Sequence, residues 1–237
     1  MKLTKKVIKK FIPSHVIAQL RNFYILAVEY GQYRTIKNWE CVDKNGEPLP
    51  WYTYPAIEYL TTLDFSKSYV FEFGGGYSTA WWAKRAKFVM TVESNYDWYK
   101  KIKDKLSNHN NVKLFLCENK EDYVNSILRT KTVFDVVVID GAWRGECAKM
   151  LDEAVLNIRD GFMIILDNSD WYPKTTRYIR DKWDLIRVDF HGFSPINSYT
   201  LTTTIFFSRN FKPYYLDKLI YSVAPIQQIA QDDFSDM

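Results

Sequence analysis

Short apolar runs rich in β-branched and aromatic residues recur from residue 69 onward, and helix-like patterns separate most of them. The apolar runs predict strands at residues 69–73, 88–92, 112–117, 135–139, 162–166, 185–190 and 202–207. Helical spacing predicts helices at 79–86, 96–107, 121–128, 146–157 and 174–183. Such alternation predicts an α/β fold with right-handed crossovers and a mostly parallel sheet that helices cover on both faces.

The alternation fails only at the last connection. Residues 191–201 are too few, and too rich in turn-forming residues, to hold a crossover helix. Antiparallel strands can be joined by a short turn, whereas parallel strands need a long crossover. We therefore expect the seventh strand to pair antiparallel with the sixth.

A basic amphipathic arm is expected ahead of the sheet. Residues 4–26 place apolar side chains near helical spacing, with a break at Pro13. Residues 43–50 are rich in turn formers and mark the end of this arm and its linker. The chain is therefore expected to divide into an arm and linker at 1–50, a domain at 51–210 and a tail at 211–237. Residues 1–26 could lie on an anionic membrane surface. Helices in this place also pack on their own domain or on a second subunit, so the oligomeric state stays open.

Charge and cysteine content narrow the class of protein. Six of the 32 basic residues precede the first acidic residue, Glu29, so the rest of the chain is nearly neutral and lacks the basic groove that nucleic acid requires. Three cysteines without a CxxC pair indicate neither a disulfide framework nor a zinc cluster. The sequence shows no apolar run of about 18 residues and no signal peptide. We expect a cytoplasmic protein that could contact the inner face of the membrane through the arm.

A glycine-rich turn follows the first predicted strand. In VFEFGGGYST, residues 70–79, Gly74, Gly75 and Gly76 would let the backbone approach a ligand closely, with Glu72 inside the strand end. The spacing differs from the dinucleotide pattern GxGxxG, and the turn alone would suit NAD, FAD or S-adenosylmethionine (SAM). Glu93 ends the second strand, where a carboxylate can accept hydrogen bonds from ribose hydroxyls. The alternative for Glu93 is a solvated loop residue.

These residues resemble the class I SAM-dependent methyltransferases over nearly all of residues 51–209. The family's first-strand motif is an acid, any residue, Gly, any residue, Gly, and Glu72, Gly74 and Gly76 occupy those positions. The resemblance implies a Rossmann-like seven-stranded sheet with a reversed last strand. It also implies that the glycine turn holds the methionine part of SAM and that Glu93 holds the ribose.

A narrower resemblance suggests the methyl acceptor. PWYTYPAIEYL, together with GGGYSTAWWA, looks like bacterial methyltransferases of surface-polysaccharide and natural-product gene clusters, which implies a sugar, a glycan or a small hydroxylated metabolite. By analogy Ser78 and Thr79 would bind the cofactor's carboxylate, although helix capping explains both equally well. Glu118 falls where family members contact adenine. Its alternative is an exposed polar loop residue.

Acidic residues also end the fourth and fifth predicted strands. Asp140 follows VVVI, and Asp167 and Asn168 follow IIL. Three oxygen ligands at one sheet edge suit Mg²⁺, and the arrangement is similar to catechol-type O-methyltransferases, which hold magnesium at the matching positions. Alternatively, Asp140 acts alone as general base or caps a turn, and the other two residues shape a loop.

Two further residues are candidates for catalysis. Arg144 stands where the catechol enzymes carry a lysine-bearing loop, and it could pair with an acidic acceptor, a phosphate, a neighbouring carboxylate or an exposed partner. His191, expected after the sixth strand, is a general base or a residue of the pocket wall.

The leading hypothesis is O-methylation. Nucleic-acid N-methylation is disfavoured because IDGAWR, and not an NPPY-like or DPPY-like sequence, follows the fourth strand. A polyamine synthase would also use an acid near Asp140, but nothing indicates a diamine pocket. The other class is a degenerate SAM-binding interaction protein, which is expected to lose the glycine turn or the ribose acid. Both are intact here.

Overall fold

A single mixed sheet forms the centre of the computed structural model, which describes residues 12–218, 220 and 222–225. Its strand order is β3-β2-β1-β4-β5-β7-β6. Strands β1 to β5 are parallel, whereas β7 is antiparallel to both β5 and β6, which confirms the predicted reversal of the last strand. The strands are β1 (Tyr69–Phe73), β2 (Phe88–Glu93), β3 (Val112–Leu116), β4 (Phe134–Ile139), β5 (Ile158–Leu166), β6 (Ile186–Phe193) and β7 (Thr200–Phe207).

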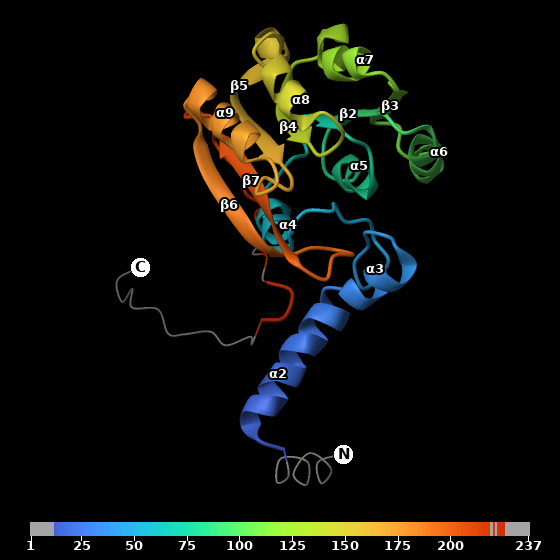
Figure 1. The fold of residues 1–237 in the computed structure, drawn as a ribbon, viewed down its shortest axis with the longest axis vertical. Coiled ribbons are helices and arrows are strands. Elements are labelled where there is room, and N and C mark those ends of the chain that lie inside the picture. The colour runs from blue at the N-terminus through green and yellow to red at the C-terminus, as the bar shows by residue number, and fades with distance from the viewer. Residues whose placement is uncertain (1–11, 219, 221, 226–237) are drawn as a thin grey trace.

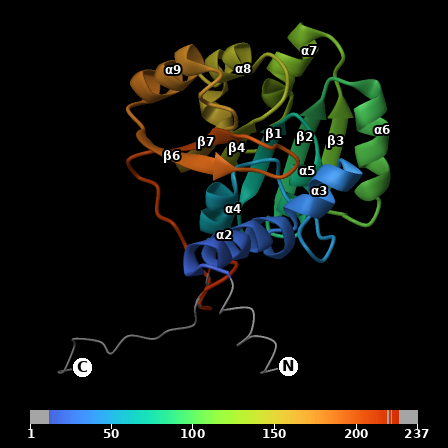
Figure 2. The same ribbon diagram turned by 60° about the horizontal axis from the view of Figure 1, so that its bottom comes forward.

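Helices cover both faces of this sheet (Figures 1 and 2). One face is covered by α4 (Tyr54–Thr61), α5 (Tyr77–Ala83) and α6 (Tyr96–Lys105), and the other by α7 (Lys120–Val124), α8 (Arg144–Met150) and α9 (Pro173–Trp183). Successive residues of a strand point to opposite faces. Accordingly Val70 packs under α4 and α5, whereas Phe71 and Phe73 pack in the core under α7 and α8.

Some predicted elements have different bounds. The helix expected at 121–128 divides into α7 and a 3₁₀ segment, Asn125–Arg129, because the Ser126 hydroxyl donates to the Tyr123 carbonyl and competes with helical bonding. The helix expected at 146–157 likewise divides into α8 and a 3₁₀ turn, Ala154–Asn157. Strand β6 continues to Phe193, since its pairing with β7 extends through Phe193 and Thr200. His191 therefore lies inside a strand, which corrects its expected place in the following loop.

The N-terminal part contains α2 (Ser14–Tyr24), a π-helical segment (Ile25–Glu29) and α3 (Gln32–Asn38). Helix α2 begins directly after Pro13 and projects from the body of the molecule (Figure 1), and none of its residues is buried. Positions 4–11 of the predicted arm lie outside the described residues. Within the described part of the chain, every helix is too short or too polar to cross a lipid bilayer.

The end of β1 is joined to its surroundings through Glu72, whose side chain is fully buried. The hydroxyls of Thr79 on α5 and Thr91 on β2 donate hydrogen bonds to Oε2 of Glu72, and the Thr91 bond measures 2.9 Å. The backbone N–H of Gly76 in turn donates to Thr79 Oγ1 over 3.0 Å. Burial raises the pKa of Glu72 to about 7, against the opposing effect of these hydroxyl donors.

We expect Glu72→Gln to make unfolding less dependent on pH. Between pH 4.5, the ordinary pKa, and about 7, the folded chain holds a proton on Glu72 that the unfolded chain has lost. The wild type therefore loses stability as the pH rises through this window, on the order of 3 kcal/mol at about 1.4 kcal/mol per pKa unit. Glutamine keeps the neutral form throughout.

Urea unfolding of the wild type and Glu72→Gln across this pH window measures the effect, with the exposed Glu153→Gln as the matched control. The free-energy difference between Glu72→Gln and the wild type should shift in favour of the variant as the pH rises. A difference that does not change with pH would contradict this account of Glu72.

Candidate active site at the carboxyl edge of the sheet

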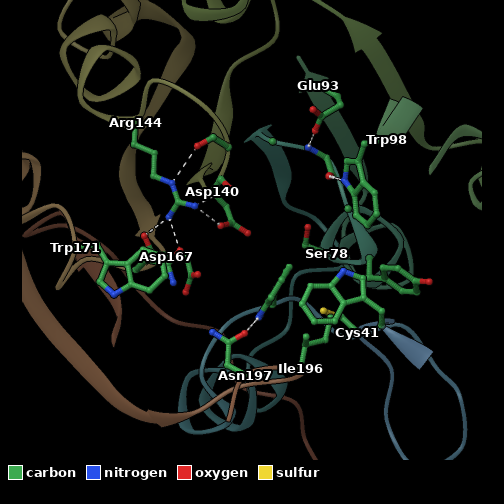
Figure 3. A pocket seen from close by; sticks show the side chains of 18 of the residues that line it. Cys41, Ser78, Glu93, Trp98, Asp140, Arg144, Asp167, Trp171, Ile196 and Asn197 are labelled. Carbon is green, nitrogen blue, oxygen red and sulfur yellow. Dashed lines mark hydrogen bonds and ion pairs between the residues drawn. The ribbon is translucent and has the colours of Figure 1, made fainter. Parts of the chain in front are cut away.

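A cavity of about 360 Å³ opens at the carboxyl ends of β1, β2, β4 and β5 (Figure 3). Its volume lies in the range of small-molecule sites. The lining includes nine residues that the sequence singled out from four separate strand ends. They are Gly74, Gly75, Gly76, Ser78, Glu93, Asp140, Arg144, Asp167 and Asn168.

The glycine turn after β1 lies directly against the turn after β4. Gly74 has φ +96°, and a Cβ placed on it would be 2.4 Å from Cα of Gly141. A Cβ on Gly141 would in turn be 2.0 Å from the hydroxyl of Tyr123. It would also be 2.6 Å from Cα of Gly74, and backbone at such distances excludes every side chain, so both positions require glycine. The sequence analysis did not identify Gly141, because its requirement for glycine arises from this contact between distant segments.

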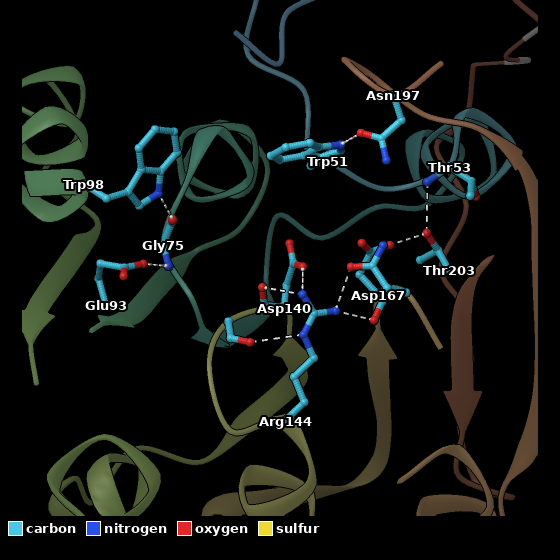
Figure 4. A network of polar contacts seen from close by, with 12 residues as sticks. Trp51, Thr53, Gly75, Glu93, Trp98, Asp140, Arg144, Asp167, Asn197 and Thr203 are labelled. Atoms are coloured by element: carbon cyan, nitrogen blue, oxygen red, sulfur yellow. Dashed lines mark hydrogen bonds and ion pairs between the residues drawn. The ribbon is translucent and has the colours of Figure 1, made fainter. Parts of the chain in front are cut away.

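Glu93 organises the opposite side of the glycine turn (Figures 3 and 4). Its Oε2 accepts a hydrogen bond of 2.9 Å from the backbone N–H of Gly75, and its Oε1 accepts two of 2.7 Å from Ser94 and Asn95. The indole N–H of Trp98 donates to the Gly75 carbonyl over 2.6 Å. Burial raises the pKa of Glu93, while the three backbone donors oppose that change. The carboxylate retains capacity to accept a further bond from a ligand in the cavity.

Arg144 joins the ends of β4 and β5 through all five of its N–H donors (Figure 4). Nε donates to the carbonyl of Gly141, at 3.1 Å. Nη2 donates to the backbone oxygen and to Oδ1 of Asp140, at 3.0 and 3.1 Å. Nη1 donates to the backbone oxygen of Asp167 and, at 3.0 Å, to Oδ1 of Asn168. The guanidinium is thus a fixed part of the cavity wall. Of the four kinds of partner that the sequence left open for Arg144, the structure shows a neighbouring carboxylate, that of Asp140.

The same geometry bears on the predicted magnesium site. The guanidinium contacts each of the three predicted ligand residues, so its positive charge lies among the groups that would otherwise surround a cation. Oδ1 of Asp167 also accepts a hydrogen bond of 2.6 Å from Thr203. The arrangement does not fit a resident magnesium ion.

Burial dominates the electrostatics of the two aspartates. It raises the pKa of Asp140 and raises that of Asp167 well above its ordinary value, and repulsion between the two carboxylates adds to the effect at Asp167. The charge of Arg144 acts in the opposite direction on both. Asp140 is therefore a stronger base than an ordinary aspartate and faces a cavity.

Aromatic side chains from other parts of the chain complete the cavity wall. Trp39 and Trp51 meet edge to face with ring centroids 6.0 Å apart, and Trp171 and Tyr199 lie 6.3 Å apart. The indole N–H of Trp51 donates to Oδ1 of Asn197 over 2.8 Å. None of these residues was predicted to line the cavity, because they lie outside the strand-end motifs, although Trp51 belongs to the segment PWYTYPAIEYL. The aromatic content of 17% is a sequence signal for such residues, but it does not say which of them line a cavity.

Four predicted site residues lie outside this wall. Glu72 and Thr79 are buried behind the glycine turn, and Thr79 accepts a hydrogen bond from the backbone N–H of Gly76. Glu118 is exposed and does not line the cavity. His191 is also absent from the cavity wall, and its Nδ1 lies 2.8 Å from the hydroxyl of Thr202 on β7. Its position does not support the predicted role of general base.

Comparison with known proteins finds no family model and no curated protein that matches the chain. Solved structures do resemble it. A protein from Klebsiella pneumoniae described as a candidate O-methyltransferase aligns with a TM-score of 0.50 at 19% identity, over 65% of this chain and 77% of its own. The O-methyltransferase TomG from Streptomyces achromogenes, involved in tomaymycin synthesis and solved with SAM, gives 0.51 at 16% identity over the same shares.

These likenesses are too distant in sequence to carry over an activity, and they bear on architecture alone. They agree with the strand order, the reversed β7 and the helices on both faces of the sheet. The chain has the class I SAM-dependent methyltransferase fold.

Proposed function

We propose that this protein is a SAM-dependent methyltransferase that methylates a hydroxyl group of a sugar, a glycan or a small hydroxylated metabolite. The observation that carries the proposal is the convergence of the glycine turn, Glu93 and Asp140 on one cavity at the carboxyl edge of the sheet. Ligands of open α/β sheets bind at this edge.

The cavity offers complementary groups for each part of SAM. The Gly74–Gly76 turn presents backbone without side chains, so the methionine portion can lie against it. Glu93, at the end of β2, has an acceptor for a ribose hydroxyl. Ser78 and Trp98 line the same side and supply a hydroxyl and an aromatic face.

Asp140 is the proposed general base. SAM supplies an electrophilic methyl group. The carboxylate of Asp140 would accept the proton of the acceptor hydroxyl as that oxygen forms its bond to the methyl carbon. The bond between the methyl carbon and the sulfur of SAM would break in the same step, its electron pair would pass to the sulfur, and S-adenosylhomocysteine would leave. Arg144 holds Asp140 by its backbone oxygen and its Oδ1, which fixes the position of the base.

The aromatic part of the wall supports a sugar-like acceptor. Trp39, Trp171 and Tyr199 are all largely exposed although they line the cavity. Exposed aromatic rings provide flat apolar surfaces with polar edges, which match the apolar faces and hydroxyl edges of a sugar ring. The aromatic wall therefore favours a hydroxylated methyl acceptor over an extended acceptor that carries positive charge.

Binding of SAM and S-adenosylhomocysteine to the purified protein tests the proposal. We expect micromolar affinity by calorimetric titration, and a loss of about 10- to 100-fold in Glu93→Gln, because a charged hydrogen-bond acceptor contributes about 1.5–3 kcal/mol. Glu153→Gln, an exposed glutamate outside the cavity, serves as the control and should bind like the wild type.

Failure of both ligands to bind the wild type would refute the methyltransferase proposal. Binding without any methyl transfer to a broad panel of hydroxylated acceptors would instead support the alternative function, a SAM-binding interaction protein that has lost catalysis. The intact glycine turn and Glu93 argue against that alternative.

Asp140→Asn should slow methyl transfer by about 10²- to 10⁴-fold, the range typical of losing a general base. Asparagine keeps an oxygen for Arg144 but cannot take up the proton. The wild-type rate should also fall as the pH is lowered, because burial raises the pKa of Asp140 and its protonated form is inactive as a base. Transfer of labelled methyl to an acceptor found in the panel measures both effects. Asp97→Asn, at an exposed position, is the control, and an Asp140→Asn rate equal to the wild type would exclude the role of base.

Magnesium should leave the thermal stability of the wild type unchanged, since Arg144 supplies the positive charge among Asp140, Asp167 and Asn168. We expect equal melting temperatures with magnesium chloride and with a chelator. Arg144→Ala should lose about 3–5 kcal/mol of unfolding free energy, because it leaves buried carboxylates without their partner. The control Arg209→Ala removes an exposed pair with Asp184 and should leave the free energy of unfolding nearly unchanged. A rise in wild-type melting temperature with magnesium would restore the metal hypothesis.

A further inference from the structure

Helix α2 carries a stripe of apolar side chains that no other described residue covers. Val16, Leu20, Phe23 and Tyr24 are all exposed, with exposed fractions of 58% for Leu20 and 70% for Phe23. Their spacing of four, three and one residues places them on one side of a helix. The other side carries the polar residues Ser14, His15, Arg21 and Asn22. The helix is therefore amphipathic, and its apolar side is exposed to solvent.

Such a helix needs a covering surface. An 11-residue helix in water is marginal by itself, and most helical stability comes from burying an apolar face. In Figure 1, α2 projects away from the sheet and its two helical layers, and none of its residues is buried, so the described core does not supply that surface. The cover must come from outside the described fold.

The positive charge of the N-terminal segment indicates which kind of surface covers α2. Before Glu29 the chain contains six basic residues and no acidic one, and five of the six are lysines at positions 2, 5, 6, 9 and 10. Lysines next to an amphipathic helix are attracted by anionic lipid headgroups, and each strengthens binding to such a surface. Two copies of this chain would bring like charges together.

The size of α2 argues in the same direction. A helix of 11 residues is about 16 Å long, whereas a stable protein interface buries roughly 800 Å² on each partner. That area would require contacts well beyond α2. A lipid surface has no such requirement, because the apolar side chains enter the headgroup region individually.

We propose that α2 is a peripheral membrane anchor that lies on an anionic bilayer surface. Val16, Leu20, Phe23 and Tyr24 enter the boundary between headgroups and acyl chains, and the excess of positive charge in the sequence before Glu29 favours an anionic surface. The proposal is independent of the cofactor, since α2 contributes no residue to the cavity.

Co-sedimentation of the full chain with vesicles tests the anchor. We expect binding to vesicles of phosphatidylglycerol and phosphatidylcholine, weak binding to phosphatidylcholine alone, and loss of binding at high salt. The double variant Leu20→Glu, Phe23→Glu should reduce partitioning into the anionic vesicles by about 10-fold or more. It should fold normally, because no residue of α2 is buried.

The matched control is Val155→Glu, Leu156→Glu, two exposed apolar residues of a 3₁₀ turn far from α2 in the sequence, and it should bind like the wild type. Equal binding by both double variants, or no preference of the wild type for anionic vesicles, would overturn the proposal. Light scattering that shows a dimer which Leu20→Glu, Phe23→Glu dissociates would also overturn it, in favour of a second copy as the partner.

Discussion

The candidate site depends on the largely buried guanidinium of Arg144. Asp140 and Asp167 end neighbouring parallel strands, so the fold itself brings two carboxylates together at a poorly hydrated edge. Without compensation such a pair is strongly unfavourable. The five N–H donors of Arg144 supply that compensation and also hold the turn at Gly141 and the amide of Asn168. The geometry of the proposed base and of the cavity wall follows from this one side chain.

A second constraint is steric and fixes the other half of the cavity. The turns after β1 and β4 touch through Gly74 and Gly141, with Tyr123 packed behind them. Glu93 and Trp98 then hold Gly75 from the other side by its N–H and its carbonyl. The turn is consequently held at both edges, and its exposed backbone faces the space where a nucleoside-containing ligand would lie. Preorganisation of this kind lowers the entropic cost of binding.

Local patterns predicted the architecture well and the site in part. Strand runs of five or six residues and the short connection at 191–201 determine topology through chain length and handedness, which are local properties. Strand ends likewise place Glu93, Asp140 and Asp167 at one edge. Contacts between distant segments carry no comparable signal. The requirement for glycine at position 141, the enclosure of Arg144, and the contribution of Trp39 and Trp51 to the cavity all depend on such contacts.

The central claim is that SAM binds between the glycine turn, Glu93 and Asp140. A crystal structure with S-adenosylhomocysteine tests it most directly. The account predicts the ribose hydroxyls within hydrogen-bonding distance of Glu93, the sulfur facing Asp140, and the guanidinium of Arg144 still between Asp140 and Asn168. A ligand bound elsewhere, or a metal ion that displaces Arg144 from these residues, would contradict it.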